Sequence, residues 1–297
     1  MASLIQILPM VFNQNIGPQV LARRPEPEEH VITDQSADVD QYNAVMNTKL
    51  AINYAIGTEA VYRSRQQPLG GSALDVACGP GHLALNFVRD LRLDNLLGVD
   101  LSKPMVDTAN SNALKQNIDC ANFQHGDATD LRFLQDDTFD LCTMMDAAHH
   151  LPTLEYVSRA LTEMDRVTSP DGLVMVMDLV RLRTEGLTEK YVNVLGADYR
   201  ERGLADFYEQ FRNSMFAAWT TEEFASAVPS DSNRKWMLLV PRGLPFAQFL
   251  FGLPRSQKKV FVRRGTPWRR APVRSEELAE YRLASLGLGM AKFAEVK

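Results

Sequence analysis

Short apolar runs alternate with amphipathic stretches through the middle of the chain. Apolar runs bounded by turn residues are typical of strands buried on both faces, whereas apolar positions three and four residues apart indicate helices. The pattern predicts strands over 73–77, 95–99, 121–125, 139–145 and 173–177. It predicts helices over about 81–91, 102–117 and 153–167. This alternation indicates an α/β, doubly wound, Rossmann-like fold with a mostly parallel sheet and right-handed crossovers.

The pattern changes before this core. Residues 1–68 are expected to form a helical segment and linker, because apolar positions recur at helical spacing between Asp38 and Arg65. Gly57 is expected to divide this stretch into two helices. A breaker cluster follows at 67–71, so the core domain is expected to begin at about residue 69.

The pattern also changes after the fifth strand. Residues of about 184–228 are predicted to form a helical insertion within a domain that extends to residue 264. Strands at 236–240 and 259–263 bring the expected sheet to seven strands, with 244–254 as an apolar loop between them. Residues 265–297 are predicted to be a tail, helical from about 275 to 296.

A glycine turn joins the first strand to its helix. The segment from Gly79 to Ala84 fits the loose dinucleotide pattern G-x-G-x-x-[GA], which is a weak signal by itself. Asp75, at the end of the strand, would repel a pyrophosphate. The same carboxylate suits the ammonium of an amino-acid moiety, such as the methionine part of S-adenosylmethionine. The sign of the charge therefore favours the second ligand.

The segment from Asp75 to Gly81, together with two later strand ends, resembles class I S-adenosylmethionine-dependent methyltransferases. Asp100 ends the second apolar strand, 21 residues beyond Gly79, where an acid can accept hydrogen bonds from ribose hydroxyls. In that family an aspartate at the place of Asp127 faces the adenine amino group, and the next backbone N–H, here that of Ala128, lies near the ring.

The resemblance implies S-adenosyl-L-methionine as cofactor. Leu101 and Met105 are expected to flank the adenosine. The residues expected to contact the cofactor are Asp75, Ala77, Gly79, Gly81, Asp100, Leu101, Met105, Asp127, Ala128 and Asp146. Several of these acids fall at the carboxyl ends of the predicted strands, where ligands bind in such sheets.

The resemblance also suggests roles for the flanking segments. In the family a leading helical segment commonly caps the cofactor site, which makes Tyr42 and Tyr54 candidate contacts, and the last two strands pair antiparallel. Small-molecule members often carry a substrate lid between the fifth and sixth strands. Substrate contacts are expected from Tyr191, Phe207, Phe211, Arg212 and Met215, although aromatic side chains there also suit a core. Arg212 could bind a substrate carboxylate or be solvated.

The segment after the fourth strand carries the candidate general bases. In the family, residues at 145–152 lie next to the transferring methyl group, and here they include Asp146, His149 and His150. Adjacent side chains point in different directions, so at most one histidine is expected to face the site; the alternative is a structural role. Catechol-type members bind magnesium through an acid after the fourth strand and an Asp-Asn pair after the fifth, and Asp146 and Asp178 occupy comparable places here. Leu179 stands in place of that Asn, so no metal is expected.

Composition limits the other function classes. The chain is 45% hydrophobic and 23% charged with a net charge of −5, so no broad nucleic-acid surface is expected. Arginines around Trp268 leave an RNA-binding alternative. Three cysteines suggest reduced thiols in a cytoplasmic protein. No membrane span or signal peptide is expected. The expected partner is a small molecule, and the expected state is a monomer or homodimer.

Three hypotheses for function remain. The first is S-adenosylmethionine-dependent methyl transfer to a small molecule, either amino-acid-derived or a natural product. The second keeps the cofactor but transfers its aminocarboxypropyl group, or cyclises it to azetidine-2-carboxylate, with release of methylthioadenosine. The third is a cofactor-sensing or partner-binding module without turnover. Release of S-adenosylhomocysteine would distinguish the first from the second.

Overall fold

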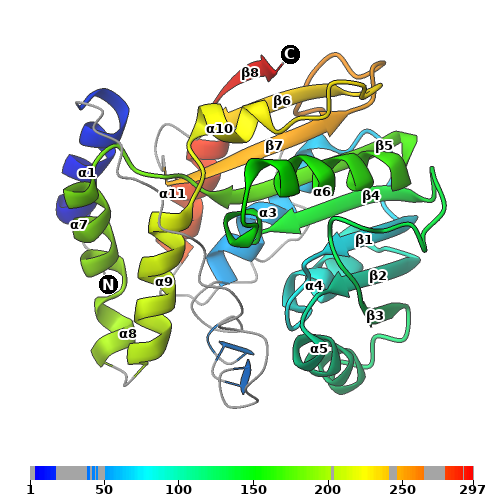
Figure 1. The fold of residues 1–297 in the computed structure, drawn as a ribbon, viewed down its shortest axis with the longest axis horizontal. Helices are drawn as coiled ribbons and strands as arrows, with labels where there is room; N and C mark the ends of the chain where they lie inside the picture. The colour runs from blue at the N-terminus through cyan, green and yellow to red at the C-terminus, as the bar shows by residue number, and fades with distance from the viewer. Residues whose placement is uncertain are drawn as a thin grey trace.

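The computed structural model of the protein describes residues 4–17, 39–40, 42–43, 45, 51–201, 204–240, 246–263, 278–289 and 291–296. Within these ranges a single sheet runs through the molecule, with helices on both faces and a further group of helices to one side (Figure 1). Trp268 and the arginines at 264, 269, 270 and 274 lie outside the described residues.

The sheet has eight strands in the order β3-β2-β1-β4-β5-β7-β6-β8. The strands from β3 to β5 in this order pair in parallel, and β7, β6 and β8 pair antiparallel with their neighbours. Their bounds are β1 Ser72–Val76, β2 Asn95–Asp100, β3 Ala121–His125, β4 Phe139–Met145, β5 Thr168–Leu179, β6 Lys235–Val240, β7 Ala247–Leu253 and β8 Lys292–Val296. The doubly wound, mostly parallel fold is confirmed, with one strand more than expected.

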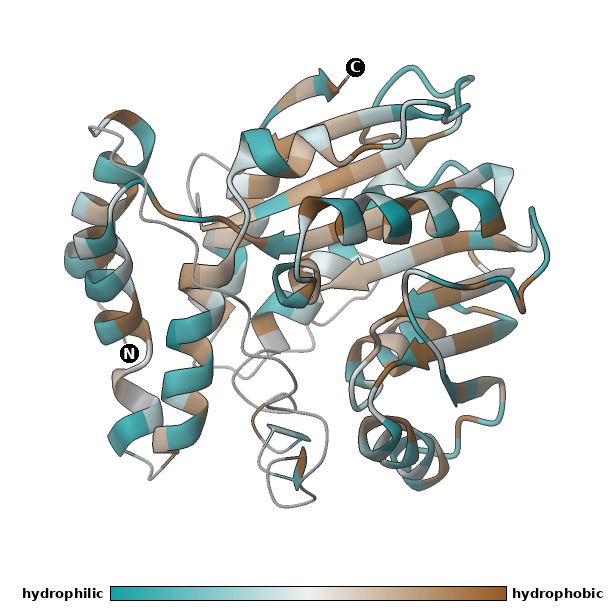
Figure 2. Cartoon of the chain, viewed as in Figure 1, coloured by the Kyte–Doolittle hydropathy of each residue, from teal (hydrophilic) through white to brown (hydrophobic). Residues whose placement is uncertain are grey.

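Two apolar layers cover the sheet. On one face pack α3 (Ala51–Ser64), α4 (His82–Leu91), α5 (Lys103–Lys115) and α11 (Leu278–Gly289). On the other face pack α6 (Leu154–Val167) and α10 (Thr221–Ser226). Figure 1 shows α6 and α10 in front of the sheet and α3 and α11 behind it. In Figure 2 the central strands β4 and β7 are hydrophobic over most of their length, as strands covered on both faces should be.

Side chains along β1 alternate between the two layers. Leu74 and Val76 belong to the layer under α6, whereas Ala73 belongs to the layer under α3 and α4. Asp75 therefore projects toward the α3 side, since successive strand residues face opposite sides of a sheet. This register brings its carboxylate to the face that carries the glycine turn.

A separate group of helices contains α1 (Leu4–Ile16), α7 (Glu185–Leu195), α8 (Ala197–Glu201) and α9 (Ala205–Ala217). These helices share a third apolar cluster, rich in aromatic side chains, and lie at the left of Figure 1. The 3-10 helix η1 (Ala148–His150), which follows β4, contacts α9. The group therefore adjoins the carboxyl end of β4.

The last strands differ from the sequence prediction. The apolar stretch expected to be a loop contains β7, which pairs with β5 from Val174 to Leu179. Residues 259–263, expected to be the seventh strand, are irregular, and both Val262 and Arg263 donate backbone N–H groups to Arg63 O. The expected terminal helix ends at Gly289, and β8 follows it at the edge of the sheet.

The expected break at Gly57 is also wrong, because α3 continues through it from Ala51 to Ser64. A Cβ atom at Gly57 would overlap the sulfur of Met145, so this glycine allows close approach of the helix to β4. Among the described residues, no helix is long and apolar enough to cross a membrane.

Candidate functional site

The residues that follow two neighbouring strands, β1 and β4, have backbone angles in the left-handed region of φ/ψ space. Ala77 follows β1 with φ 53°, and Asp146 follows β4 with φ 49°. Non-glycine residues rarely adopt this conformation, and such strain is concentrated at functional sites. Both turns lie at the carboxyl ends of adjacent parallel strands, the edge at which α/β sheets bind ligands.

The glycine turn after β1 depends on two glycines with positive φ, for different reasons. Gly81 has φ 78°, and a Cβ atom there would lie 2.8 Å from Cζ of Phe123. Gly79 has φ 53°, and a Cβ atom there would meet nothing within 4 Å. Gly81 therefore fits the turn against β3 and α5, whereas Gly79 leaves open space beside the backbone.

Asp100 joins the first two strand-to-helix turns. Its Oδ2 accepts from Gly79 N at 2.7 Å, and its Oδ1 accepts from Ser102 N at 2.8 Å. Burial raises the pKa of Asp100, and the two backbone hydrogen bonds lower it in part. Ionised carboxylates carry about four acceptor positions, so these bonds leave capacity for hydroxyl groups of a ligand.

Asp75 is buried beside the same turn. Its Oδ1 accepts from Thr143 Oγ1 on β4 at 2.6 Å. The pKa of Asp75 is raised to about 7, mainly by burial; the Thr143 hydrogen bond lowers it in part, and the charge of Asp100 adds to the rise. A cation placed here would favour the ionised form of Asp75.

His149 and Asp178 form a buried pair behind Asp146. Nδ1 of His149 donates to Oδ1 of Asp178, the carboxylate at the end of β5, at 2.6 Å. His150, in contrast, is exposed, so of the two candidate bases only His149 is placed inside the protein. Because a carboxylate only accepts, Nδ1 carries a hydrogen, and in the neutral ring the lone pair is then on Nε2.

Asp146 lies close enough to this pair to respond to it. Its pKa is raised to about 7, first by burial and then by the charge of Asp178, whereas His149 and a hydrogen bond from the Asn53 side chain lower it. Its Oδ1 is buried and has no hydrogen-bond partner among the described residues. Buried polar atoms of native proteins rarely stay unpaired, so this oxygen indicates a place for a ligand or water.

Three tyrosines lie within electrostatic reach of Asp146. Burial raises the pKa of Tyr42, Tyr54 and Tyr191, and the negative charge of Asp146 raises all three further. Tyr191 on α7 stacks on Phe246 with ring centroids 4.1 Å apart. All three tyrosines also pack against the aromatic cluster of the lateral helices. This cluster therefore meets the acidic site at Asp146.

The remaining expected substrate residues have different surroundings. Phe207, Phe211 and Met215 all lie in or against the aromatic cluster, and Met215 is fully buried. Nε of Arg212 donates to Glu189 Oε1 at 3.0 Å, and its guanidinium lies over the Phe216 ring. Arg212 thus joins α9 to α7 through an ion pair.

The expected adenine contacts lie on two loops and, for Met105, on α5. Leu101 is 54% exposed, whereas Met105 is 2% exposed and belongs to the core beneath it. Asp127 is exposed, and its Oδ1 accepts from both N and Oγ1 of Thr129 at 2.8 Å; the next residue, Ala128, packs against the core. Leu101 and Asp127 are therefore the accessible members of this set.

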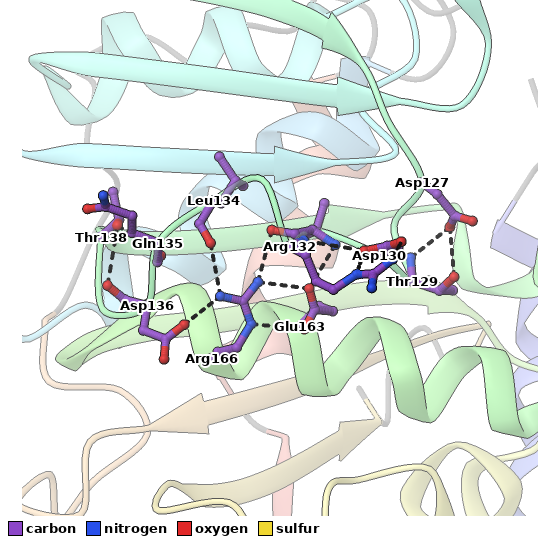
Figure 3. Close-up of polar contacts among 11 residues, drawn as sticks. Asp127, Thr129, Asp130, Arg132, Leu134, Gln135, Asp136, Thr138, Glu163 and Arg166 are labelled. Atoms are coloured by element: carbon purple, nitrogen blue, oxygen red, sulfur yellow. Dashed lines mark hydrogen bonds and ion pairs between the residues drawn. The ribbon is translucent and has the colours of Figure 1, made fainter.

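The loop after Asp127 is fastened to α6. Nη1 of Arg166 donates to Leu134 O at 3.0 Å, and Nη2 donates to Leu131 O at 2.9 Å (Figure 3). Glu163, one turn earlier, holds Arg166 and accepts from Leu131 N at 2.7 Å. This pair on α6 fixes a loop that has little regular structure of its own.

These features fit the cofactor that the sequence predicts. The charged groups that act on Asp75, Asp100 and Asp146 are aspartates and two histidines, with no lysine or arginine among them in the described part of the chain. Such a set suits a ligand with a sulfonium and an ammonium, and opposes a pyrophosphate. The described residues also contain no group of three or more acids, histidines or cysteines that could hold a metal.

Sequence reasoning missed the partners that set these properties. Thr143 and Asn53, which hydrogen-bond Asp75 and Asp146, lie on β4 and α3, and Asp178 is 29 residues from His149. The placement of Asp178 at a strand end was the only signal for it in the sequence. Local periodicity contains no information on which side chain lies across a parallel sheet.

Comparisons with known proteins show similarity to methyltransferases. Residues 74–176 match a family model described as a methyltransferase domain. The chain is 32% identical over 164 residues to the uncharacterized methyltransferase YcgJ of Bacillus subtilis, and the match covers 54% of this chain and 62% of YcgJ. It is 29% identical over 156 residues to the ubiquinone/menaquinone biosynthesis C-methyltransferase UbiE of Bdellovibrio bacteriovorus, covering 52% of this chain and 63% of that protein. The chain thus spans less than two thirds of these relatives.

A solved structure supports the fold. A Methanococcus maripaludis protein, provisionally assigned as an S-adenosyl-L-methionine-dependent methyltransferase, superposes with a TM-score of 0.56 at 16% identity. The superposition covers 75% of this chain and 95% of that protein. At this identity the similarity concerns the arrangement of strands and helices.

Proposed function

Because residues 74–176 form a domain of the class I S-adenosylmethionine-dependent methyltransferase family, we propose that the chain is an enzyme that methylates a small molecule. The observation that supports this most directly is the buried set of Asp75, Asp100 and Asp146 at the carboxyl edge of the sheet, which suits a cationic donor. When bound, S-adenosyl-L-methionine supplies a methyl group that is already activated on a sulfonium.

The residues of the chain divide between holding the donor and preparing the acceptor. Asp100, next to the glycine turn, would accept from the ribose hydroxyls, and Asp75 and Asp146 would face positive charge. Leu101 and Asp127 would contact the adenine. Most of the rate would come from alignment, since a fixed geometry removes the entropy cost of bringing two reactants together.

His149 is the proposed general base. Its Nε2 would accept the proton of the acceptor's nucleophilic atom while Asp178, hydrogen-bonded to Nδ1 at 2.6 Å, holds the tautomer and stabilises the imidazolium that forms. The carboxylate of Asp146 lies close enough to favour that positive charge as well. A base of this kind increases the reaction rate about 10²–10⁴-fold when the nucleophile must lose a proton.

The proposed acceptor is a small molecule with an apolar or aromatic body. Two observations support this: the aromatic cluster that reaches Asp146 through Tyr42, Tyr54 and Tyr191, and a relative named as a quinone-pathway C-methyltransferase. Amino-acid-derived and natural-product acceptors fit the same description. Phe207, Phe211 and Met215 would then form the packed base of the lid, with Arg212 as part of its frame.

The test is a product assay. The chain is incubated with S-adenosyl-L-methionine and a panel of phenolic, quinol and amine acceptors, and the nucleoside product is identified by mass spectrometry. S-adenosylhomocysteine with a methylated acceptor is the expected result, whereas methylthioadenosine would overturn methyl transfer in favour of chemistry at another carbon of the sulfonium.

In parallel, Asp100→Ala should weaken donor binding about 10–100-fold in calorimetry, because a charged acceptor of two hydroxyl groups is lost. Unchanged affinity would contradict the ribose role.

A further inference from the structure

The short helix that carries His149 is held from outside by a tryptophan. Nε1 of Trp219 donates to the backbone O of Ala148, the residue before His149, at 2.9 Å, and both partners are buried. The same oxygen accepts from Leu151 N at 3.2 Å within the turn. η1 has only three residues and begins after Ala147, whose side chain provides no cap. The indole therefore adds a constraint that the turn cannot supply from its own residues.

The backbone of Trp219 is fixed beside the other half of the pair, at the end of β5. Its O accepts from Arg181 N and from Nε2 of Gln248, both at 3.1 Å. The same Nε2 donates to Leu179 O at 3.0 Å, and Leu179 directly follows Asp178. Trp219 therefore connects the turn after β4 to the strand end that carries Asp178.

Gln248 is an unusual residue for its strand. It is fully buried on the otherwise apolar β7, and it pairs in register with Asp178. Burying an amide is costly unless its groups are hydrogen-bonded. Here Nε2 donates to both Leu179 O and Trp219 O, whereas Oε1 has no partner among the described residues. The amide is thus oriented by its donor side, toward the segment that contains Trp219.

Trp219 also marks the place where the helical insertion returns to the sheet. α9 ends at Ala217 and α10 begins at Thr221, with Trp219 between them. The Trp219 side chain belongs to the apolar layer under α6 and α10, and α9 itself contacts η1. The end of the insertion is therefore joined to the turn that carries the proposed base.

We propose that Trp219 is a positioning residue for the base: its hydrogen bond to Ala148 O, made from a backbone fixed at the end of β5, keeps the imidazole of His149 in line with Asp178. The inference rests on the proposed function, since it concerns the same base. Trp219 acts through the backbone of η1 and not on the substrate. Loss of the bond should leave donor binding intact, because the glycine turn after β1 is built from other residues.

Trp236 provides a matched control. It is 3% exposed, against 5% for Trp219, and belongs to the same apolar layer. Its Nε1 donates to Ser232 Oγ at 2.8 Å, and it pairs with Gly252, toward the far end of β7 from Gln248. Trp236→Phe and Trp219→Phe thus lose the same kind of donor. Replacement of either residue by benzothienylalanine, in which sulfur takes the place of the indole N–H, removes the donor and keeps the size, which serves if Trp219→Phe folds poorly.

The first measurement needs no turnover. The Nδ1 proton of His149 lies in a buried bond of 2.6 Å, so it should exchange slowly with water and give a low-field signal in the proton NMR spectrum of the full chain. His149→Gln assigns the signal by abolishing it. Both Trp219 variants should move the signal upfield or broaden it, whereas both Trp236 variants should leave it in place.

The second measurement is single-turnover kinetics with an acceptor from the product assay. Trp219→Phe should slow the chemical step about 10-fold while the dissociation constants of acceptor and donor stay unchanged, because alignment and not binding is lost. Adding Trp219→Phe to Asp178→Asn should slow the step little further, since both substitutions act on one pair. Trp236→Phe should match the parent rate at a comparable loss of thermal stability.

A His149 signal that is the same in the parent and in both Trp219 variants would overturn the proposal, whatever reaction the protein catalyses. Equal losses of rate in Trp219→Phe and Trp236→Phe would also overturn it, because the effect would then follow stability alone. If the parent releases no S-adenosylhomocysteine with any acceptor, the proposed function fails, and the NMR comparison still decides whether Trp219 holds the pair.

Discussion

Nδ1 of His149 lies 2.6 Å from Oδ1 of Asp178, and both side chains are almost completely buried. The carboxylate sets the tautomer of the ring, so the pair has the arrangement of a base and its orienting acid. Two strand ends contribute to this arrangement, because Asp146 and then His149 in η1 follow β4, and Asp178 belongs to β5.

Removing the orienting acid should slow the proposed reaction. Asp178→Asn presents an amide to Nδ1 and favours the opposite tautomer, so we expect kcat to fall about 10²–10⁴-fold while donor affinity changes little. The measurement is single-turnover kinetics with an acceptor from the product assay, alongside calorimetry of donor binding. Asp171→Asn is the control, because Asp171 is an exposed acid on the same strand, β5. Equal rates in Asp178→Asn and the parent would remove the pair from the mechanism.

Substitution of Gly81 should affect mainly the stability of the protein, whereas substitution of Gly79 should affect donor binding as well. Gly81→Ala adds a Cβ atom 2.8 Å from the Phe123 ring at φ 78°, so we expect a loss of about 2–4 kcal/mol in the free energy of unfolding. Gly79→Ala incurs only the left-handed conformation, about 1–2 kcal/mol, but places a methyl group in the open space beside the turn. Urea denaturation and calorimetry with S-adenosyl-L-methionine measure the two effects. The interpretation fails if both variants lose the same stability.

Donor binding should depend on pH around neutrality. The folded protein keeps Asp75 and Asp146 protonated up to a pKa of about 7, well above the ordinary value of 3.8. The native state therefore binds more protons than the unfolded chain between about pH 4 and pH 7, and stability should fall as pH rises through this range. A cationic donor favours the ionised carboxylates, so its affinity should rise over the upper part of the same range, with release of protons.

Calorimetry at pH 7 in buffers of different ionisation enthalpy measures that proton release. Asp75→Asn and Asp146→Asn should each reduce the number of protons released, because the substituted group no longer titrates. Donor affinity that is flat from pH 6 to pH 8 would contradict the assignment of these two acids to the donor.

Substitution of Arg166, which holds the loop after β3, should lower both the stability of the protein and its affinity for the donor. Arg166→Ala removes donors to Leu131 O and Leu134 O and leaves Glu163 without its ion-pair partner, so we expect about 1–3 kcal/mol of lost stability and weaker donor binding. Arg132→Ala breaks only a solvent-exposed pair with Asp130 on the same loop, and its unfolding midpoint should match the parent (Figure 3). Equal shifts in the two variants would show that the α6 contacts do not anchor the loop.

The parallel half of the sheet could be predicted because its signals are local. Each strand is an apolar run closed by a turn, and the glycines at 79 and 81 mark the first turn unambiguously. The cofactor residues followed from the resemblance, and the structure brings Asp75, Asp100 and the glycine turn together. Acids at strand ends could be expected to lie together, because parallel strands all finish at one edge.

The antiparallel half of the sheet was harder to predict because its strands do not show the usual alternation of polar and apolar residues. β7 lacks polar alternation since both of its faces are buried, and the proline at 254 made the stretch resemble a loop. Residues 259–263 alternate like an edge strand but bind the backbone of Arg63 instead of the sheet. At Gly57 the helix continues because packing against Met145 outweighs glycine's poor helix propensity.

The helix α3 has contacts at two levels along its length. Asn53, near its start, hydrogen-bonds Asp146, and Glu59, less than two turns later, accepts from the hydroxyls of Tyr281 and Ser285 on α11. The same helix, α3, therefore contacts both Asp146 in the site and the C-terminal helix α11. A homologue that lost α11 would need other contacts to hold α3 in place. Substitutions around Tyr281 should therefore be correlated with substitutions around Asn53 among homologues.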